Sequence, residues 1–443
     1  MKLTLFRNAI IFVSLILLAG GIGFRLGASR QGYAFVSGTF AGTSVPPSTA
    51  GVNAKGIDFS LFWDVWQRLS DRYIDKKALD TQKMFYGAIS GMVASLNDPY
   101  TLFLPPKENK EAKDDLGGLF EGIGAQLGMK DKRIIIMAPL PGTPAEQAGL
   151  RAGDWILKVD GEDTLTWTLP QAVSHIRGTK GTAVTLSILH EKDNKPKDIR
   201  IVRDQIHVAS VEWKKENLRC TSGNGSSNCT LVKGSCSDCI SVAVLKLTRF
   251  GDTTISEWDK AVGEIAKENC GLGNPRCSGI VLDVRNNPGG YLQGAIYIGS
   301  EFLADGTITK QKNSDGSVQT YAVERKGKLV TQPLVVLANK GSASASEIVA
   351  GALKVRGRAR MVGEKTYGKG SVQDAEDLAN GAGLHVTIAL WLLPDDSQIN
   401  GSGIEPNVAI EPLENTGGDT QTRDIQLEKA VEDLVYNSSN KKI

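Results

Sequence analysis

The sequence from Lys340 to Gln373 reads KGSASASEIVAGALKVRGRARMVGEKTYGKGSVQ, and its pattern determines the fold expected for the surrounding chain. Three serines stand among small residues at its start, and an apolar run typical of a helix extends from Ile348 to Val355. A short strand is predicted at Ala359–Gly363, and a lysine framed by two glycines, Lys369, follows it. A buried strand is also predicted just upstream, at Val335–Ala338. Strand, helix and strand in succession are typical of a layered α/β domain.

The same stretch contains the parts of a simple nucleophilic site. A serine hydroxyl is a poor nucleophile until a base removes its proton. A lysine can be that base when burial lowers its pKa enough to leave the amine neutral. The sequence therefore suggests a serine at a helix N-terminus with Lys369 as its base, and Lys365 as an alternative base. The same letters are also compatible with a turn, a helix and a strand that carry no chemistry.

A second motif with a possible role in this site is DVRNNPGG, at Asp283–Gly290. It follows a predicted buried strand and leads into a helix expected to start near Tyr291. Successive backbone N–H groups at a glycine turn and a helix start can hold an anion. By itself, this pattern is equally typical of ordinary strand-to-helix turns.

Residues 113–204 form a separate module of short strands with glycine-rich turns. Their order, and the pattern PA…AGL..GD within Thr143–Asp154, resemble a PDZ domain. Such a domain binds an extended C-terminal peptide beside one of its strands and holds the carboxylate with loop N–H groups. The peptide-binding residues expected in the first glycine-rich loop are Leu119, Phe120, Glu121, Gly122, Ile123 and Gly124. A small β-sandwich without a ligand is the alternative.

The N-terminus has the layout of an export signal. Lys2 and Arg7 precede an apolar run, Ala9–Phe24, and no clear small-residue cleavage site follows it. We expect residues 1–30 to be an uncleaved membrane anchor; a cleaved signal and a buried core helix are the alternatives. Residues 31–55 are rich in Gly, Ser, Thr and Pro and predict a flexible linker. This layout predicts a protein of the cell envelope whose folded body lies outside the cytoplasm.

All six cysteines lie between Cys220 and Cys277. An even number in an exported chain favours disulfides, although the pairing does not follow from the sequence. The CxxC at Cys236 and Cys239 is also compatible with half a zinc site or a redox pair, and free thiols are a further alternative. The polar, Gly- and Ser-rich residues 218–239 are predicted to be a surface insertion between strands.

The composition excludes several classes of function. The chain has 443 residues, a formal net charge of +2 and no long basic run, so no nucleic-acid partner is expected. It has four histidines and lacks HExxH and G-x-S-x-G, which argues against a zinc peptidase and a histidine-based triad. No phosphate-binding loop occurs either. The sequence therefore predicts neither a metal nor a cofactor.

Several motifs together resemble the carboxyl-terminal processing (tail-specific) proteases, peptidase family S41. These motifs are SASASEI, VGE with TYGKGSVQ, DVRNNPGG, GAISGM with LNDPY, and GIEP. They occupy the chain from about residue 57 to about residue 412, with the PDZ-like module among them. The cysteine-bearing segments are departures from the family pattern.

The resemblance implies an α/β (α+β) multidomain fold. It would combine a ClpP/crotonase-like α/β protease core with an inserted PDZ domain and an N-terminal helical segment. The expected parts after the anchor and linker are an N-terminal helical region at 56–112, the PDZ domain at 113–204, the core at 205–415, and a C-terminal helix and tail at 416–443.

The resemblance also implies a serine-type endopeptidase. Ser344 would be the nucleophile, Lys369 the general base, and Gln373 the residue that orients the lysine. The N–H of Ala345 would hold the oxyanion.

A second oxyanion donor would come from the turn at Gly289 and Gly290. Expected partners are protein or peptide substrates with free C-termini, captured by the PDZ domain, the membrane through the anchor, and a possible homo-oligomer. In the family, the PDZ position is expected to gate the site. The competing hypotheses are a catalytically silent peptide-binding scaffold and, less supported, a small-ligand carrier.

Overall fold

The computed structural model describes residues 57–130, 133–140, 142–190, 193–223, 226–234, 236–271, 274, 277–412 and 423–440. The predicted anchor at 1–30 and linker at 31–55 lie outside the described residues. The chain divides into two compact units, Met1–Leu79 and Asp80–Ile443, which are treated separately. Across the part of the chain that is described, no helix has the length and apolar character needed to cross a membrane.

The first unit contains the helix α2 (Ser60–Arg72) and a short 3-10 turn, η1 (Lys76–Ala78). In α2, the rings of Phe62, Trp63 and Trp66 contact one another with centroids 5.1 to 6.2 Å apart. No residue of α2 is buried. These contacts are therefore local to the helix.

The second unit begins with α3 (Thr81–Ala94), β1 (Leu102–Leu104) and α4 (Pro106–Leu116). As its Asn-Asp-Pro sequence predicts, a turn follows α3, and Asn97 adopts a φ of 54° there. β1 pairs antiparallel with β19 (Gly383–Leu392). The N-terminal part of this unit is thereby attached to a strand from the far end of the sequence.

The PDZ-like module contains β2 (Leu119–Gly122), β3 (Ala125–Lys130), β4 (Arg133–Pro139), α5 (Pro144–Gln147), β5 (Trp155–Val159), β6 (Glu162–Asp163), α6 (Leu169–Ile176), β7 (Ala183–Leu189), β8 (Lys197–Val202) and β9 (Asp204–His207). Five strands form a sheet in the order β3-β4-β5-β7-β8, with β6 on β5. Its core takes every second residue of β7, namely Val184, Leu186 and Ile188, as period-2 alternation requires. β2 and β9 pair where the chain enters and leaves the module. Because Leu119 pairs with His207, the module extends three residues beyond its predicted end at 204.

The remaining chain is built on β10 (Val211–Gly223), β11 (Ser226–Val232), β12 (Ile240–Leu247), α7 (Thr254–Lys267), β13 (Ile280–Asp283), α8 (Leu292–Phe302), β16 (Leu334–Ala338), α9 (Ala345–Val355), β17 (Arg360–Gly363), β20 (Val408–Ala409) and α10 (Ile425–Asn440). Seven strands form one sheet in the order β11-β10-β12-β13-β16-β17-β20. The strands β12, β13, β16, β17 and β20 run parallel to one another, while β10 pairs antiparallel with β12.

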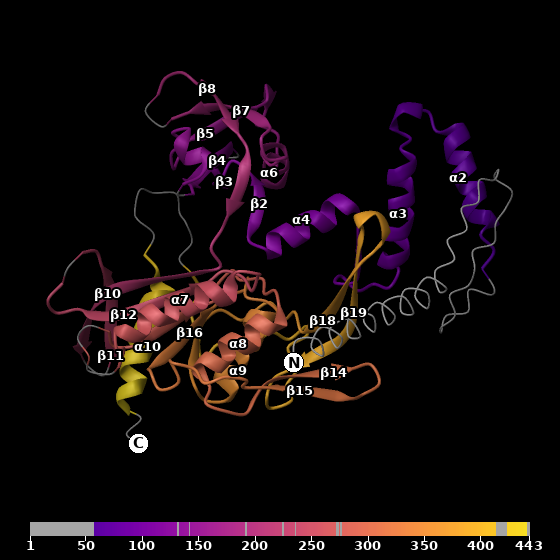
Figure 1. The fold of residues 1–443 in the computed structure, drawn as a ribbon. Helices are drawn as coiled ribbons and strands as arrows, with labels where there is room; N and C mark the ends of the chain where they lie inside the picture. Colours follow the sequence, from indigo (N-terminus) through magenta and orange to yellow (C-terminus); the bar gives the residue numbers. More distant parts are fainter. Residues whose placement is uncertain are drawn as a thin grey trace, which may run out of the picture. The chain divides into compact units, whose positions relative to one another are not determined.

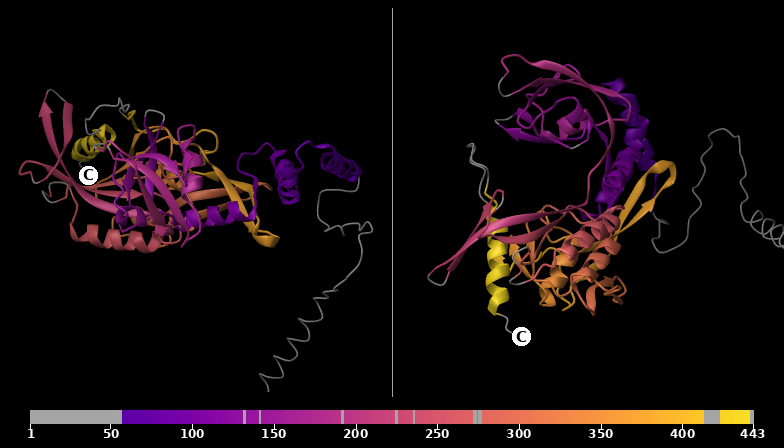
Figure 2. Two further views of the ribbon diagram at one scale, coloured as in Figure 1. Left: turned by 90° about the horizontal axis from the view of Figure 1, so that it is seen from above. Right: turned by 60° about the vertical axis from the view of Figure 1, so that its left-hand side comes forward.

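Helices cover both faces of this sheet. In β13, Ile280 and Leu282 join the core cluster that contains residues of α7, α8 and α9. Val281, between them, joins the cluster formed with α10. Figures 1 and 2 show α7, α8 and α9 together and α10 apart from them. The predicted layered α/β arrangement is thus confirmed: successive strand residues are buried on opposite faces.

A second sheet contains the end of the Lys340–Gln373 stretch, because β18 begins at Ser371. It adds β14 (Thr307–Asn313), β15 (Val318–Ala322) and β18 (Ser371–Asp377) to β1 and β19. The order is β1-β19-β14-β15, and β18 also pairs with β19. β18 and β19 form the long orange hairpin of Figure 1.

The six cysteines form three local disulfides, Cys220–Cys229, Cys236–Cys239 and Cys270–Cys277. This confirms disulfides over a zinc site or free thiols. The prediction of a polar surface insertion at 218–239 is wrong, because most of this segment forms the hairpin β10–β11 within the main sheet. Leu218 and Cys229 are buried in the cluster formed with α10, which explains why an otherwise polar segment is structured.

Candidate active site

Ser344 lies at a sharp turn between β16 and α9, where it is the N-cap residue of α9. Its φ of 54° and ψ of −118° are rare for a residue with a side chain. Strained backbone of this kind persists only where its surroundings hold it, and it is concentrated at functional sites. Ala345, the first residue of the helix, is buried. Its N–H belongs to the first turn, whose N–H groups have no partner within the helix.

The two outer serines of the SASAS sequence have structural partners. Ser342 is fully buried, and its Oγ donates to the carbonyl of Val284 at 2.8 Å. Ser346 is also fully buried, and its Oγ donates to the carbonyl of Asn287 at 2.6 Å. Ser344 is only half-buried. The three serines, equivalent in the sequence, are therefore distinguished by their environment, and Ser344 is the candidate nucleophile.

The glycine turn of the DVRNNPGG motif lies directly against Ser344. Gly289 has a φ of 100°, and a Cβ atom placed on it would lie 2.7 Å from the Cβ of Ser344 and 3.0 Å from the N of Ala345. Gly290 has a φ of 137°, and a Cβ there would lie 2.1 Å from the carbonyl oxygen of Phe250. Only glycine permits this approach. The predicted second oxyanion element is therefore next to the candidate nucleophile.

The two glycine N–H groups differ in their availability. Gly289 N–H donates to the side-chain oxygen of Asn287 at 2.9 Å. Asn287 is itself buried and donates to the carbonyl of Leu247. The bond from Gly289 holds the shape of the turn, which makes Gly290 the stronger candidate for the second oxyanion donor.

Lys369 lies in the loop between β17 and β18 and is half-buried. The glycines around it have a steric role: Cβ atoms on Gly368 and Gly370 would lie 2.9 Å from the N of Gly403 and 2.2 Å from the N of Asn400. Burial lowers the pKa of the Lys369 ammonium, which is the direction a general base requires. Its Nζ lies 5.1 Å from the ring centroid of Tyr100.

The alternative base, Lys365, has a different environment. Its Nζ pairs with Glu405 at 2.7 Å, and 52% of its side chain is exposed. The amine of Lys365 is therefore engaged in an ion pair and open to solvent, whereas Lys369 is half-buried. The environments of the two lysines therefore favour Lys369 as the candidate base.

Gln373 lies on β18 and is half-buried. Its Nε2 donates to Ser371 Oγ at 2.7 Å and to Thr387 Oγ1 at 3.2 Å. Both partners belong to the β18–β19 hairpin that follows Lys369. The amide nitrogen is thus oriented by this hairpin, and its predicted contact with Lys369 stays a prediction.

Glu347 is a site residue that was not predicted. It lies in the first turn of α9 and is fully buried. Its Oε2 accepts the backbone N–H of Ser344 and that of Lys369, each at 2.9 Å. Its Oε1 accepts Gly368 N–H at 2.7 Å and the Thr366 hydroxyl at 2.5 Å.

The carboxylate of Glu347 therefore connects the turn at Ser344 to the loop that contains Lys369. Burial raises the pKa of Glu347, while the hydrogen bonds from Thr366, Gly368, Ser344 and Lys369 oppose this rise. The sequence contained a signal for it, because Ser344-x-x-Glu347 matches the capping-box pattern at a helix start.

In the PDZ-like module, the six predicted peptide-binding residues lie in two settings. Leu119, Phe120, Glu121 and Gly122 form β2, paired with β9. Ile123 and Gly124 form the connection to β3, an edge strand of the sheet. Gly124 has a φ of 78°, and its carbonyl accepts the Thr143 hydroxyl at 2.9 Å. The structure contains no peptide, so their role stays a prediction.

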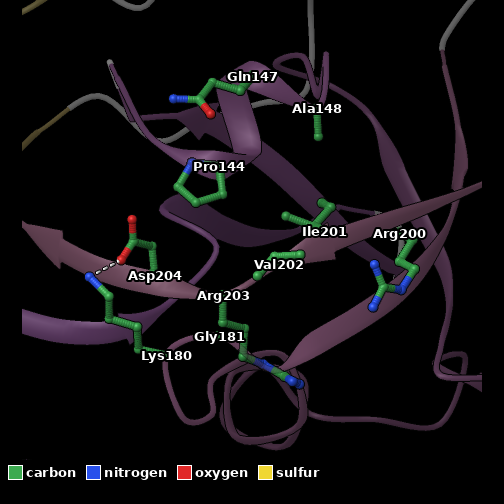
Figure 3. A pocket seen from close by; sticks show the side chains of 10 residues that line it. All are labelled: Pro144, Gln147, Ala148, Lys180, Gly181, Arg200, Ile201, Val202, Arg203 and Asp204. Carbon is green, nitrogen blue, oxygen red and sulfur yellow. Dashed lines mark ion pairs between the residues drawn. The ribbon is translucent and has the colours of Figure 1, made fainter.

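A separate hollow of about 490 Å³ opens in the same module, between α5 and the end of β8. Figure 3 shows its lining, with an ion pair of 2.6 Å between Lys180 and Asp204 at one side. Neither the catalytic candidates nor the predicted peptide-loop residues line it. It is therefore distinct from both predicted sites.

Comparison with known proteins identifies the family of the chain. A model described as peptidase family S41 matches residues 241–410, which include Ser344 and Lys369, and a PDZ domain model matches residues 135–189. A protein from Bacteroides fragilis assigned to the S41 proteases has a solved structure that covers 89% of this chain and 100% of its own, with a TM-score of 0.50 at 15% identity. That similarity concerns the fold alone.

Two relatives extend the similarity over most of the chain. The carboxy-terminal processing protease CtpB of Bacillus subtilis is 34% identical over 373 residues, which cover 83% of this chain and 71% of that protein. The carboxyl-terminal-processing protease of Synechocystis is 34% identical over 385 residues, covering 86% and 84%. Identity at this level over this length shows common descent, and the chain belongs to the carboxy-terminal processing proteases of peptidase family S41, as a serine-type peptidase that carries a PDZ domain.

Proposed function

We propose that the protein cleaves protein substrates near their C-termini, with Ser344 as the nucleophile and Lys369 as the general base. The observation that carries this proposal is the shared acceptor Glu347 Oε2, which binds the backbone N–H of both residues. One rigid, buried carboxylate thereby fixes the two loops relative to each other. Fixed relative positions of this kind are what a nucleophile and its base need.

The proposed reaction has two halves. The neutral amine of Lys369 takes the proton from Ser344 Oγ as the oxygen attacks the scissile carbonyl carbon. The C–N bond then breaks, the leaving amine takes the proton from the Lys369 ammonium, and an acyl-enzyme remains on Ser344. A water molecule attacks the ester while Lys369 accepts its proton, and return of that proton to Ser344 Oγ releases the product acid.

The oxyanion of each tetrahedral intermediate would be stabilised by the N–H groups of Ala345 and Gly290. Donors of this kind typically contribute about 3–4 kcal/mol each. The carboxamide oxygen of Gln373 would accept from Lys369 and orient it. The turn geometry at Gly289 supports this assignment, because it brings the glycine turn against the N-terminus of α9.

Substrate capture is assigned to the PDZ domain. An extended C-terminal segment would lie beside β3, with its carboxylate held by the N–H groups of the Ile123–Gly124 loop. We further propose that the position of this domain gates the catalytic site. Deletion of residues 116–204 tests the gating: an unchanged cleavage rate together with unchanged substrate choice would refute it.

The main test compares wild-type protein with Ser344→Ala and Lys369→Ala on an unstructured substrate that has an apolar C-terminal tail. We expect cleavage by wild type and a loss of at least about 1,000-fold in both variants. Cleavage that persists in both variants refutes the dyad. Peptide binding without any cleavage by wild type would instead support the silent scaffold.

We also propose that the protein acts in the cell envelope, held to the membrane by residues 1–30, with its catalytic body outside the cytoplasm. The charged and apolar pattern of this segment supports the proposal. Fractionation of cells that express the full chain, followed by protease treatment of intact cells or spheroplasts, tests it. Full-length protein in the soluble cytoplasmic fraction would contradict it.

A further inference from the structure

The sequence LNDPYT, which lies between α3 and β1, packs against the strands that follow Lys369. The turn is self-supported: Thr101 Oγ1 donates to Asp98 Oδ2 at 2.6 Å, and Tyr100 N–H donates to Asp98 Oδ1 at 3.1 Å. Thr101 Oγ1 also accepts the backbone N–H of Thr387 at 3.0 Å. Thr387 is the residue whose hydroxyl contacts the amide of Gln373. The turn is therefore hydrogen-bonded directly to the β18–β19 hairpin, which follows Lys369 in the chain.

This attachment places the side chain of Tyr100 on Lys369. The Nζ of Lys369 lies 5.1 Å from the Tyr100 ring centroid, within the range of a cation–π contact. Both side chains are half-buried. The phenol of Tyr100 also interacts with Tyr367, two residues before the lysine. Tyr100 is thus held by Asp98 through its backbone, and its side chain contacts Lys369 and Tyr367.

A ring in this position has two opposing effects on a lysine. It removes water from one side of the ammonium, which lowers the pKa of the lysine. It also attracts the cation through its quadrupole, which favours the charged form. Burial lowers the pKa of Lys369 in this structure, and the Tyr100 ring lies close enough to the ammonium to contribute to that burial.

We propose that Tyr100 is a positioning residue for Lys369: its ring forms one wall of the base pocket, holds Nζ near Ser344 and limits its hydration. This inference rests on the proposed role of Lys369 as the general base. It assigns a function to the LNDPYT motif, which otherwise is only a turn between a helix and a strand.

Other titratable groups also lie close to Lys369 and Tyr100. Glu347 on α9 accepts the backbone N–H of Lys369, and Asp98 lies beneath the Tyr100 turn. His385 on β19 has a pKa lowered by burial and by the charge of Lys369, so it is neutral near pH 7. Burial, together with the neighbouring Tyr367, raises the pKa of Tyr100 to about 12. The phenol therefore stays protonated and does not compete with Lys369 as the base.

The test is the pH dependence of kcat/KM for the full-length protein, compared among wild type, Tyr100→Phe and Tyr100→Ala. Activity should rise with pH as Lys369 loses its proton, which gives the pH profile a rising limb. In Tyr100→Ala, water reaches the ammonium, and we expect this limb to move up by about one pH unit, with kcat/KM near neutral pH reduced about tenfold. Tyr100→Phe retains the ring and should keep the limb in place.

A matched control separates this effect from loss of docking. The Tyr86 ring packs on Phe103 at 5.8 Å, in the same N-terminal segment. Tyr86→Ala should loosen the segment and lower the melting temperature without moving the limb. If Tyr100→Ala unfolds, Tyr100→Gln fills the space with a polar side chain and should show the same shift. An unmoved limb in folded Tyr100→Ala or Tyr100→Gln, or an equal shift in Tyr86→Ala or Tyr100→Phe, overturns the proposal.

A second measurement distinguishes failure of this inference from failure of the proposed function. Competitive acetylation of lysines at a series of pH values, followed by mass spectrometry, measures the neutral fraction of Lys369 without reference to catalysis. In Tyr100→Ala, Lys369 should become reactive only at higher pH than in wild type. This shift supports the inference even if Lys369→Ala retains activity. Identical labelling curves would overturn it even if the dyad is correct.

Discussion

Glu347 Oε2 accepts the backbone N–H of Lys369 at 2.9 Å, across 22 residues of sequence. The same oxygen accepts the N–H of Ser344, whose φ of 54° needs external support. A buried carboxylate with four donors is thus the structural link between two loops that the sequence presents as separate motifs.

Replacement of Glu347 by alanine should therefore inactivate the enzyme. The buried N–H groups of Ser344, Gly368 and Lys369 would lose their acceptor, which should lower the free energy of unfolding by about 3 kcal/mol. We expect kcat/KM to fall by more than about 100-fold, because a displacement of about 1 Å at the reacting groups has that effect.

The matched control is Glu301→Gln. Glu301 is equally buried, and it accepts backbone N–H groups from Lys328 and Leu329 rather than from the site. This variant should lose stability but keep the kcat/KM of the folded fraction. Equal activity losses in the Glu347 and Glu301 variants, measured below their melting temperatures, would contradict the positioning role of Glu347.

Gly289→Ala should also inactivate the enzyme. Its Cβ would lie 2.7 Å from that of Ser344, so the turn or the nucleophile must move. Gly316→Ala controls for strain alone, because Gly316 has a φ of 85° and open space around it. Both variants should lose about 1–2 kcal/mol of stability to the positive φ. Only Gly289→Ala should lower kcat, and retention of wild-type kcat by that variant would remove the turn from the proposed oxyanion site.

Arg285→Ala should destabilise the protein by about 3 kcal/mol, because it leaves two carboxylates without their shared partner. The guanidinium of Arg285 binds Asp283 at 2.7 Å and Asp424 at 2.9 Å, which ties the end of β13 to the start of α10. Burial alone would raise the pKa of Asp424, but the bonds from Arg285 lower it overall.

A carboxylate with a lowered pKa contributes stability above its unfolded pKa, near 3.8, and this stability is lost as pH falls through the folded value. Chemical denaturation of wild type and Asp424→Asn, repeated at pH 7 and pH 3, measures this contribution. The difference in stability between the two proteins should shrink at pH 3. A constant difference would show that the charge of Asp424 has no part in it.

The double replacement Cys220→Ser and Cys229→Ser should affect stability without affecting catalysis. These cysteines face each other on paired strands, β10 and β11. Loss of a short disulfide loop typically costs about 2–3 kcal/mol. Two strands, β12 and β13, separate β10 from β16, the strand that leads to Ser344. A thermal melt should show the loss, and an altered kcat/KM at a temperature where the variant is folded would contradict this separation.

Much of the site could be predicted because its signals are local. Small residues before a helix indicated a serine at its N-terminus, and the resemblance to the family selected Ser344 among the three. The glycines around Lys369 indicated close backbone contact. The contacts of Tyr100 and the second role of Glu347 could not be predicted, because each depends on which strands pair. Residues 218–239 were predicted to be a polar surface insertion, because their Gly and Ser residues conceal the alternation that buries Leu218 and Cys229.

The pairing of β19 has a consequence for the order in which activity can arise. This one strand pairs with β1, β14 and β18, and the bond from Thr387 to Thr101 spans 286 residues. Contacts between such distant segments form late, because closing a long chain costs entropy before any contact compensates for it. A chain still being synthesised would already contain Ser344 and Lys369 but would lack the strand that completes the surroundings of Lys369. Activity would then arise only after β19 has paired with all three of its partners.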